Sequence, residues 1–167
     1  FVDIDTQVDF VKSGGALYVE RAERLIPTWK TLTEFGEEHA LPMIASADNH
    51  PPNDPEFEKF PPHCVQNTPG QRKIPETLCT DHQVIPNDPR ETTIDFDNQI
   101  ILFKQSYDVF TNVHADEVFG TVRCSAFVVY GVTTDYCIRC AVLGLLERGY
   151  RVHVVADAIE AIDREAG

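Results

Sequence analysis

Chemically reactive side chains stand at the ends of four apolar runs in this sequence, at Asp5, Asp48, Lys104 and Cys137. A thiol can attack a carbonyl carbon once a neighbouring base has taken its proton, and a nearby ammonium group can stabilise the charges that result. Asp5 is the predicted base, which would take the proton of Cys137 and later return it to a leaving group. Lys104 is predicted to balance both charges.

The segment around Cys137 has the pattern of a strand, a tight turn and a helix. Residues 126–130 are apolar, Gly131 begins the turn, and residues 135–148 are predicted to be helical with Cys137 in the first turn. The helix dipole and unpaired N–H groups would favour the thiolate, so we expect this thiol to have a lowered pKa. The backbone N–H groups of Thr133 and Cys137 are the predicted oxyanion donors. The alternative is a capped helix with a cysteine buried in the core.

A second group of candidate ligands lies in an acidic, proline-rich segment and comprises Asp48, His50, Glu56 and His63. An Asp-x-His pair that follows a strand projects both side chains toward one side. Two carboxylates with two imidazoles suit a divalent metal ion. We expect Zn²⁺, with Fe²⁺ and Mn²⁺ as alternatives. Ordinary loop histidines with local hydrogen bonds would explain His50 and His63 without a metal.

Cys137 and Cys140 also form a Cys-x-x-Cys pair near a helix start, which is a redox motif in some proteins. On that interpretation the chain is a thiol redox protein or a non-catalytic binding module. A dithiol switch, however, has no use for Lys104 or for a metal-binding segment. The neighbours Ala141 and Leu145 resemble core residues, so we predict that Cys140 packs rather than reacts.

Apolar runs that alternate with helical patterns predict the fold. The predicted strands are residues 1–5, 41–47, 99–103, 126–130 and 151–155, and the predicted helices are residues 21–39, 115–121 and 135–148. Strands that are apolar throughout, joined by helices, are typical of a parallel sheet covered on both faces. We therefore predict an α/β fold with three α/β/α layers around a doubly wound, mainly parallel sheet. Ligands of such sheets bind beyond the carboxyl ends of the strands, so the four reactive side chains are expected to share one crevice.

A single domain over residues 1–167 is expected from the length of the chain. The chain begins inside an apolar run and ends just after a strand, so this domain is expected to be truncated at both ends. Residues 49–98 contain most of the prolines and are predicted to form a long loop. Loops of this length are often functional, and this one is expected to bind the metal and to cover the site like a lid.

Charge and cysteine usage restrict the partners. The formal net charge is −13 and the isoelectric point is about 4.7. This acidity argues against nucleic acid and against an anionic membrane surface, and it leaves a small-molecule substrate. The five cysteines are an odd number without a dense framework, which favours reduced thiols and a cytoplasmic location.

Three motifs in this chain resemble those of one family: the run Asp-Thr-Gln-Val-Asp-Phe at residues 5–10, Lys104 between Phe103 and Gln105, and the run from Gly131 to Cys137. In order and spacing they are similar to the motifs of the isochorismatase-like cysteine hydrolases, and within them to the nicotinamidase-like branch. The resemblance covers essentially the whole chain. It implies a Rossmann-like topology and the hydrolysis of a small amide through a thioester on Cys137. Nicotinamide and water would give nicotinic acid and ammonia, a reaction of NAD salvage.

The resemblance also implies roles for individual residues. The catalytic residues would be Asp5, Lys104 and Cys137. The metal ligands would be Asp48, His50, Glu56 and His63, with Glu58 as the alternative to Glu56. The substrate ring would lie between Phe10 and Phe60, and the rest of the lining would come from Tyr107 and Phe110. A cis peptide bond is implied at Val132–Thr133.

Two further expectations follow from the same resemblance. Relatives that cleave carbamoyl compounds or other small amides provide the alternative activity, and they generally lack the metal-binding segment. Family members are often oligomeric, so the resemblance allows for a homo-oligomer.

Overall fold

A computed structural model describes residues 1–97, 99–163 and 165 of the chain. In these residues one parallel sheet has the strand order β3-β4-β2-β1-β5-β6. The strands are β1 (Val2–Ile4), β2 (Ile44–Asp48), β3 (His82–Ile85), β4 (Gln99–Lys104), β5 (Phe127–Val132) and β6 (Val152–Glu160). The predicted α/β class with a parallel sheet is thereby confirmed.

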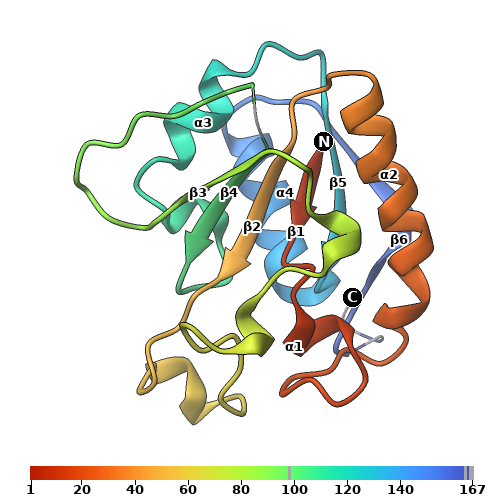
Figure 1. The fold of residues 1–167 in the computed structure, drawn as a ribbon, viewed down its shortest axis with the longest axis vertical. Helices are drawn as coiled ribbons and strands as arrows, with labels where there is room; N and C mark the ends of the chain where they lie inside the picture. Colours follow the sequence, from red (N-terminus) through yellow and green to blue (C-terminus); the bar gives the residue numbers. More distant parts are fainter. Residues whose placement is uncertain (98, 164, 166–167) are drawn as a thin grey trace.

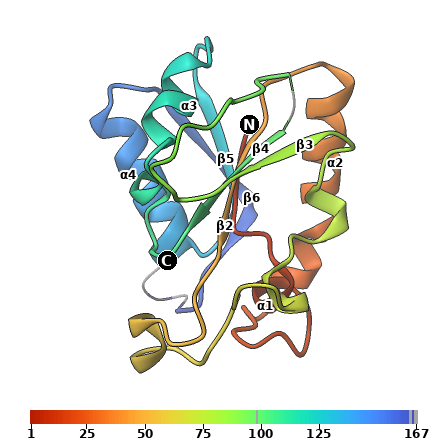
Figure 2. The same cartoon turned by 60° about the vertical axis from the view of Figure 1, so that its left-hand side comes forward.

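Helices cover both faces of the sheet. They are α1 (Val8–Val11), α2 (Ile26–Glu38), α3 (Ala115–Thr121) and α4 (Arg139–Glu147). Figure 2 shows α2 on one side of the sheet and α3 with α4 on the other, which gives the predicted three layers. Within the described residues, no helix has the length and apolar character that crossing a membrane requires.

The two larger apolar clusters hold the layers together. Val129 belongs to the cluster between the sheet and the layer of α3 and α4, whereas the next residue, Tyr130, belongs to the cluster that contains Trp29 of α2. Successive side chains of a strand point to opposite faces, so a strand between two helical layers must be apolar on both. This requirement explains why the central strands appear in the sequence as unbroken apolar runs.

The structure differs from the sequence prediction mainly at the two edges of the sheet. Strand β3 lies within the predicted loop 49–98, and β6 continues to Glu160, beyond the predicted end at residue 155. Both strands pair on one side only and have largely exposed or half-buried side chains. An edge strand with a solvated face has no continuous apolar run, and the expected signal is therefore absent from the sequence.

Two short elements also differ from the prediction. Between the predicted strand 1–5 and the predicted helix 21–39 the structure has a further element, α1, a single helical turn. The predicted helix at residues 135–148 begins as a π-helical turn, Thr134–Ile138, before α4 continues it. The carboxyl ends of β2 and β4 point toward the loop that follows β2 (Figure 1). Residues at these ends and in this loop therefore form one side of the molecule.

Candidate active site and metal centre

Lys104 is at the centre of the polar cluster beyond the sheet. It is the last residue of β4 and stands in register with Asp48, the last residue of β2. Its fully buried Nζ forms an ion pair with Asp5 Oδ2 at 2.8 Å and a second one with Asp48 Oδ1, and it lies 3.7 Å from Cys137 Sγ. Three side chains at or after the ends of three other strands thus converge on this ammonium group.

The position of Asp5 follows from its place directly after β1. Its backbone has a φ of 51°, and its N–H donates to the carbonyl of Ser46 on the neighbouring strand. The Ser46 hydroxyl in turn donates to Asp5 Oδ1 at 2.7 Å. One carboxylate oxygen is thereby held by the scaffold, and the other is directed at Lys104.

Burial changes the acidity of every member of this cluster. Burial and the negative charge of Asp48 raise the pKa of Asp5 above its ordinary value, although Lys104 opposes them. For Asp48 burial acts in the same direction, but Lys104 and His50 outweigh it and lower the pKa of this carboxyl. Burial opposes the charge on Lys104, yet the carboxylates and the thiol around it raise its pKa well above the usual range. Lys104 is therefore a permanent cation here.

The thiol of Cys137 does not have the lowered pKa predicted from its place near a helix start. Burial raises the pKa of Cys137 well above its ordinary value, and the charge of Lys104 offsets this only in part. The helix also begins with a π turn, and Cys137 is its fourth residue. Desolvation of the thiolate outweighs the helix dipole because dipole effects are modest and the group is shielded from water. The resting thiol therefore holds its proton close to Asp5.

The turn before Cys137 depends on an exceptional backbone. Gly131 has a φ of 123°, and a Cβ at this position would collide with the backbone of Ile4 on β1. Only glycine allows the two strands to approach so closely here. The peptide bond between Val132 and Thr133 is cis, as the resemblance implied. The N–H of Ile138 donates to the carbonyl of Thr133 at 3.0 Å, which closes the π turn.

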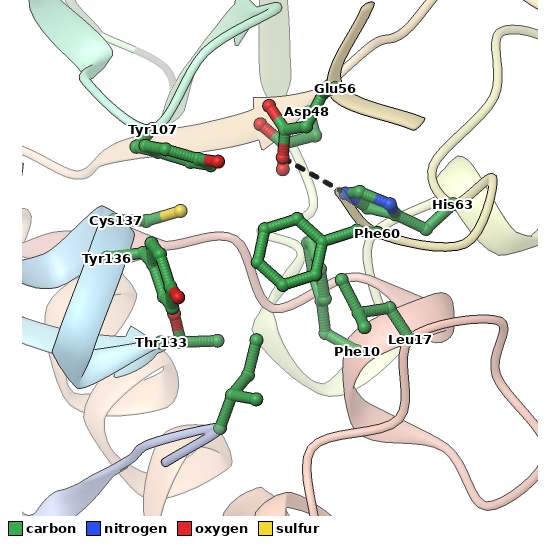
Figure 3. A pocket seen from close by; sticks show the side chains of 11 residues that line it. Phe10, Leu17, Asp48, Glu56, Phe60, His63, Tyr107, Thr133, Tyr136 and Cys137 are labelled. Atoms are coloured by element: carbon green, nitrogen blue, oxygen red, sulfur yellow. Dashed lines mark ion pairs between the residues drawn. The ribbon is translucent and has the colours of Figure 1, made fainter. Parts of the chain in front are cut away.

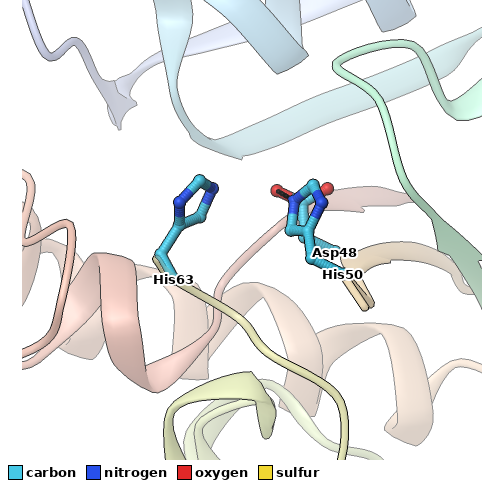
Figure 4. A group of neighbouring side chains, drawn as sticks. All are labelled: Asp48, His50 and His63. Atoms are coloured by element: carbon cyan, nitrogen blue, oxygen red, sulfur yellow. Dashed lines mark ion pairs between the residues drawn. The ribbon is translucent and has the colours of Figure 1, made fainter. Parts of the chain in front are cut away.

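Asp48, His50 and His63 form a compact set of buried candidate ligands (Figure 4). One ligand atom from each lies within 4.8 Å of the other two. Glu56 Oε1 lies 3.7 Å from His63 Nε2, so the fourth predicted ligand adjoins the set. Among the described residues His50 Nε2 is buried without a hydrogen-bond partner. A metal ion would satisfy this nitrogen, and the mixed oxygen and nitrogen donors fit Zn²⁺.

The surroundings of the two histidine rings suit metal binding. His63 Nδ1 lies 2.8 Å from the carbonyl of Pro61, so a proton on Nδ1 would leave Nε2 free to bind a metal. Burial lowers the pKa of His63. Burial also disfavours the charged form of His50, but Asp48 and other carboxylates outweigh it and raise the pKa of His50 to about 9. The carboxylates around His50 therefore favour a positive charge at this ring.

A small pocket adjoins the thiol and the candidate metal ligands. It is lined by Phe10, Leu17, Asp48, Glu56, Phe60, His63, Tyr107, Thr133, Tyr136, Cys137 and Ile162. Figure 3 shows the Phe60 ring across the middle of this pocket, between Tyr136 and His63. The free volume is about 10 Å³, which is room for about one water molecule.

The half-buried rings of Phe60, Tyr107 and Tyr136 form what we call the aromatic roof of the pocket. Phe60 meets the two tyrosines edge-on, with ring centroids 6.5 and 5.5 Å away. The ammonium group of Lys59 lies over all three rings, 5.0, 5.4 and 4.6 Å from the centroids of Phe60, Tyr107 and Tyr136. Such contacts are attractive, so Lys59 holds three separate chain segments together.

One predicted lining residue lies elsewhere. Phe110 packs against Phe119 of α3, and the guanidinium of Arg148 lies 3.6 Å from its ring centroid. A Cβ on Gly144 would collide with the Phe110 ring, so this ring is inserted tightly against α4. Phe110 is therefore half-buried against the core and does not line this pocket. Its aromatic character was compatible with either role.

Sequence reasoning did not identify the residues that position the site. Gln7 Nε2 donates to the carbonyls of Asp48 and Gln71, and Gln7 Oε1 accepts from the N–H of Asp48 at 2.7 Å. Asp9 Oδ2 accepts from the N–H of Cys64, the residue after His63. Gln7 and Asp9 belong to the Asp-Thr-Gln-Val-Asp-Phe run, and this motif could have indicated their positioning role. No sequence pattern indicated the pocket-lining residues Leu17, Tyr136 and Ile162. None indicated Asp54 either.

The fold and this cluster define a class: three-layer α/β proteins with a buried cysteine, aspartate and lysine at the carboxyl edge of a parallel sheet. A family model described as the Isochorismatase domain matches residues 1–166, and the chain belongs to this family.

Individual relatives are similar over nearly the whole chain. The nicotinamidase of Escherichia coli (strain K12) is 27% identical over 177 residues, which cover 96% of this chain and 82% of that protein. The crystal structure of the pyrazinamidase of Pyrococcus horikoshii in complex with zinc matches with a TM-score of 0.79 and 26% identity, over 99% of this chain and 87% of that one. The N-carbamoylsarcosine amidase from Thermoplasma acidophilum matches with a TM-score of 0.76 and 26% identity, over 98% and 85%.

Proposed function

We propose that the protein is a metal-assisted cysteine amidohydrolase that converts nicotinamide and water to nicotinic acid and ammonia. The observation that carries the proposal is the position of Lys104, which contacts Asp5 and Cys137 beside the ligand set of Asp48, His50 and His63. The enzyme class, hydrolysis of amide C–N bonds, agrees with the family and with the names of the relatives. Nicotinamide is the substrate suggested by the curated relative.

The buried cluster suits proton transfer followed by nucleophilic attack. Asp5, whose pKa is raised, takes the proton of Cys137 as the sulfur bonds to the amide carbon. The N–H groups of Thr133 and Cys137 stabilise the negative oxygen that forms. Asp5 returns the proton to the nitrogen, the C–N bond breaks and ammonia leaves. Lys104 remains charged throughout and compensates the charge on Asp5 or the thiolate.

A second half-reaction releases the product. Water attacks the thioester carbon while Asp5 accepts a proton from it, the bond to Cys137 breaks, and the sulfur recovers that proton. The products are a carboxylic acid and the free thiol, so atoms and charges balance. The same base and the same oxyanion donors serve both steps.

The metal and the aromatic side chains orient the substrate. A divalent ion, Zn²⁺ in the first instance, would be held by Asp48, His50 and His63 with Glu56 nearby, and it would supply a Lewis-acid contact for the pyridine nitrogen. Phe10 and the aromatic roof would enclose the ring. Binding both ends of a small substrate fixes the amide carbon next to the sulfur, which is how positioning contributes to rate.

The proposal is tested by ammonia release from nicotinamide. The zinc-loaded protein should be active, and Cys137→Ala should lower the rate by at least about a thousandfold because the covalent step is lost. Cys140→Ser is the matched control and should retain activity. Equal loss in the two variants would instead favour a dithiol redox function.

A second candidate is the hydrolysis of a non-pyridine amide or carbamoyl compound, suggested by the similarity to an N-carbamoylsarcosine amidase. Such a substrate has no ring nitrogen for a metal. Chelation of the metal should therefore abolish turnover of nicotinamide but hardly change turnover of a carbamoyl compound. Inactivity on nicotinamide together with activity on another amide would reject the substrate and retain the mechanism.

A further inference from the structure

Asp54 stands beside the candidate metal centre although it is not one of the predicted ligands. Its side chain is 7% exposed, and Oδ2 lies 3.0 Å from Nδ1 of His50. The other oxygen, Oδ1, accepts a hydrogen bond from the N–H of Glu56 at 2.9 Å. The two oxygens of one carboxylate thus contact two of the four candidate ligand residues.

The contact with His50 has a direct chemical consequence. A carboxylate can only accept a hydrogen bond, so Asp54 favours a proton on Nδ1 of His50. The lone pair is then on Nε2, which lies 3.7 Å from Asp48 Oδ2. Neither ring nitrogen has a hydrogen bond of regular geometry among the described residues, so Nδ1 is held by its ion-pair contact with Asp54 while Nε2 is left for a metal. Histidine ligands of metals are commonly oriented in this way by a carboxylate on the second ring nitrogen.

The contact with Glu56 acts on the backbone. Asp54 is the N-cap of the 3₁₀ turn Pro55–Glu58, which contains Glu56. The cap fixes where this turn starts and so where the Glu56 carboxylate can reach, 3.7 Å from His63 Nε2. The Phe57 ring of the same turn packs edge-on against His50 and His63, with centroids 5.5 and 5.8 Å away.

We propose that Asp54 is the positioning residue of the metal centre, which sets the tautomer and ring orientation of His50 and the place of Glu56. The inference rests on the metal centre of the proposed function and not on the identity of the organic substrate. It predicts that Asp54 determines metal affinity without touching the metal itself.

Asp54→Asn separates the two contacts. An asparagine side chain has one acceptor oxygen, which can cap the turn, and its NH₂ group then cannot accept a hydrogen bond from Nδ1 of His50. We expect zinc affinity to fall about 10- to 100-fold, as is typical when such a partner is lost. Zinc affinity is measured by competition with a chromophoric chelator. The visible spectrum of the cobalt-substituted protein provides a second measure, because it responds to ligand geometry.

Asp108→Asn is the matched control. Asp108 is likewise the N-cap of a 3₁₀ turn and accepts from the N–H of Phe110 at 2.9 Å, but its carboxylate caps a turn outside the candidate ligand set. Its zinc affinity and cobalt spectrum should match those of the wild type. Asp54→Ser also keeps a capping oxygen while losing the contact with His50, so it should reproduce the loss if Asp54→Asn folds poorly.

The outcomes separate this inference from the proposed function. Zinc affinity and a cobalt spectrum that are unchanged in Asp54→Asn and Asp54→Ser would overturn the role of Asp54, even if the wild type deamidates nicotinamide. A wild type that binds no zinc would also overturn it. Reduced zinc affinity in both variants supports the inference even where nicotinamide proves not to be the substrate.

Discussion

Two buried lysines near β1 allow a test of what Lys104 contributes beyond stability. Lys104 pairs with Asp5 at 2.8 Å, and Lys73 pairs with Asp3 at 2.7 Å, its side chain only 4% exposed. Each pair joins a carboxylate of the first strand region to an ammonium group from a distant part of the chain. Only Lys104 also contacts the thiol, at 3.7 Å.

Replacement of Lys73 by methionine removes the lysine partner of buried Asp3, and replacement of Lys104 removes that of Asp5 and of Asp48. Both Lys104→Met and Lys73→Met should therefore lower the free energy of unfolding by about 3–5 kcal/mol, measured by urea denaturation. At a temperature where both variants are folded, only Lys104→Met should lose kcat, by about a hundredfold or more, since the ammonium group that balances Asp5 and the thiolate is gone. An equal loss of kcat in Lys73→Met would assign Lys104 a purely structural role.

Among the structural elements, three connecting segments meet at the aromatic roof: the loop after β2, the segment after β4 and the π turn after β5. Phe60, Tyr107 and Tyr136 come from these segments in that order, and Lys59 lies over all three rings. With a free volume of about 10 Å³, the pocket accepts a pyridine ring only if some of its lining moves. The half-buried roof can move at lower cost than the buried floor formed by Phe10, His63 and Cys137.

Loss of the Lys59 cation should therefore loosen the roof. We expect Lys59→Gln to increase the rate of Cys137 alkylation by iodoacetamide several-fold, because the three rings lose their shared partner. The rate is measured by mass spectrometry of the peptide that contains Cys137. Lys30→Gln, which alters an exposed lysine paired with Glu34 on α2, is the control and should have no effect. An unchanged rate in Lys59→Gln would show that Lys59 does not restrict access.

On the scale of the whole molecule, a hydrogen bond joins the first long helix to the last strand. Trp29 of α2 is fully buried, and its indole N–H donates to the carbonyl of Ala158 on β6 at 2.8 Å. Strand β6 is at the edge of the sheet and has many exposed side chains, and besides its partner strand β5 it packs against α2, α4 and the 3₁₀ turn Ala22–Leu25. The contact thus ties the C-terminal part of the chain to the N-terminal part.

Trp29→Phe should weaken this tie without affecting the site. A buried carbonyl without a donor, together with the reduced ring volume, should lower the free energy of unfolding by about 1–3 kcal/mol in urea denaturation. The kcat of the folded protein should be unchanged. Phe35→Leu on the same helix is the control: Phe35 is 47% exposed, so the change should stay within about 0.5 kcal/mol. A loss in Phe35→Leu as large as that in Trp29→Phe would contradict a specific role for the indole.

The central part of the fold could be predicted from the sequence because its signals are local. Strands β1, β2, β4 and β5 lie between two helical layers, and they therefore appear as apolar runs that any reader of the sequence can find. Three of these runs end at Asp5, Asp48 and Lys104, and the fourth leads through a turn to Cys137. The carboxyl ends of parallel strands meet at one edge. The convergence of Asp5, Asp48, Lys104 and Cys137 followed from these two facts alone.

Only the tertiary structure decided what depends on distance and burial. The edge strands β3 and β6 have solvated faces, so the neighbouring strand rather than the local pattern determines that they form. The raised pKa of Cys137 results from burial by segments far away in the chain, which the position near a helix start could not reveal. For the same reason the local pattern could not place Phe110 against the core or Asp54 beside the candidate metal ligands. Residue type and spacing determine which chemistry is available, and packing between distant segments determines which side chains carry it out.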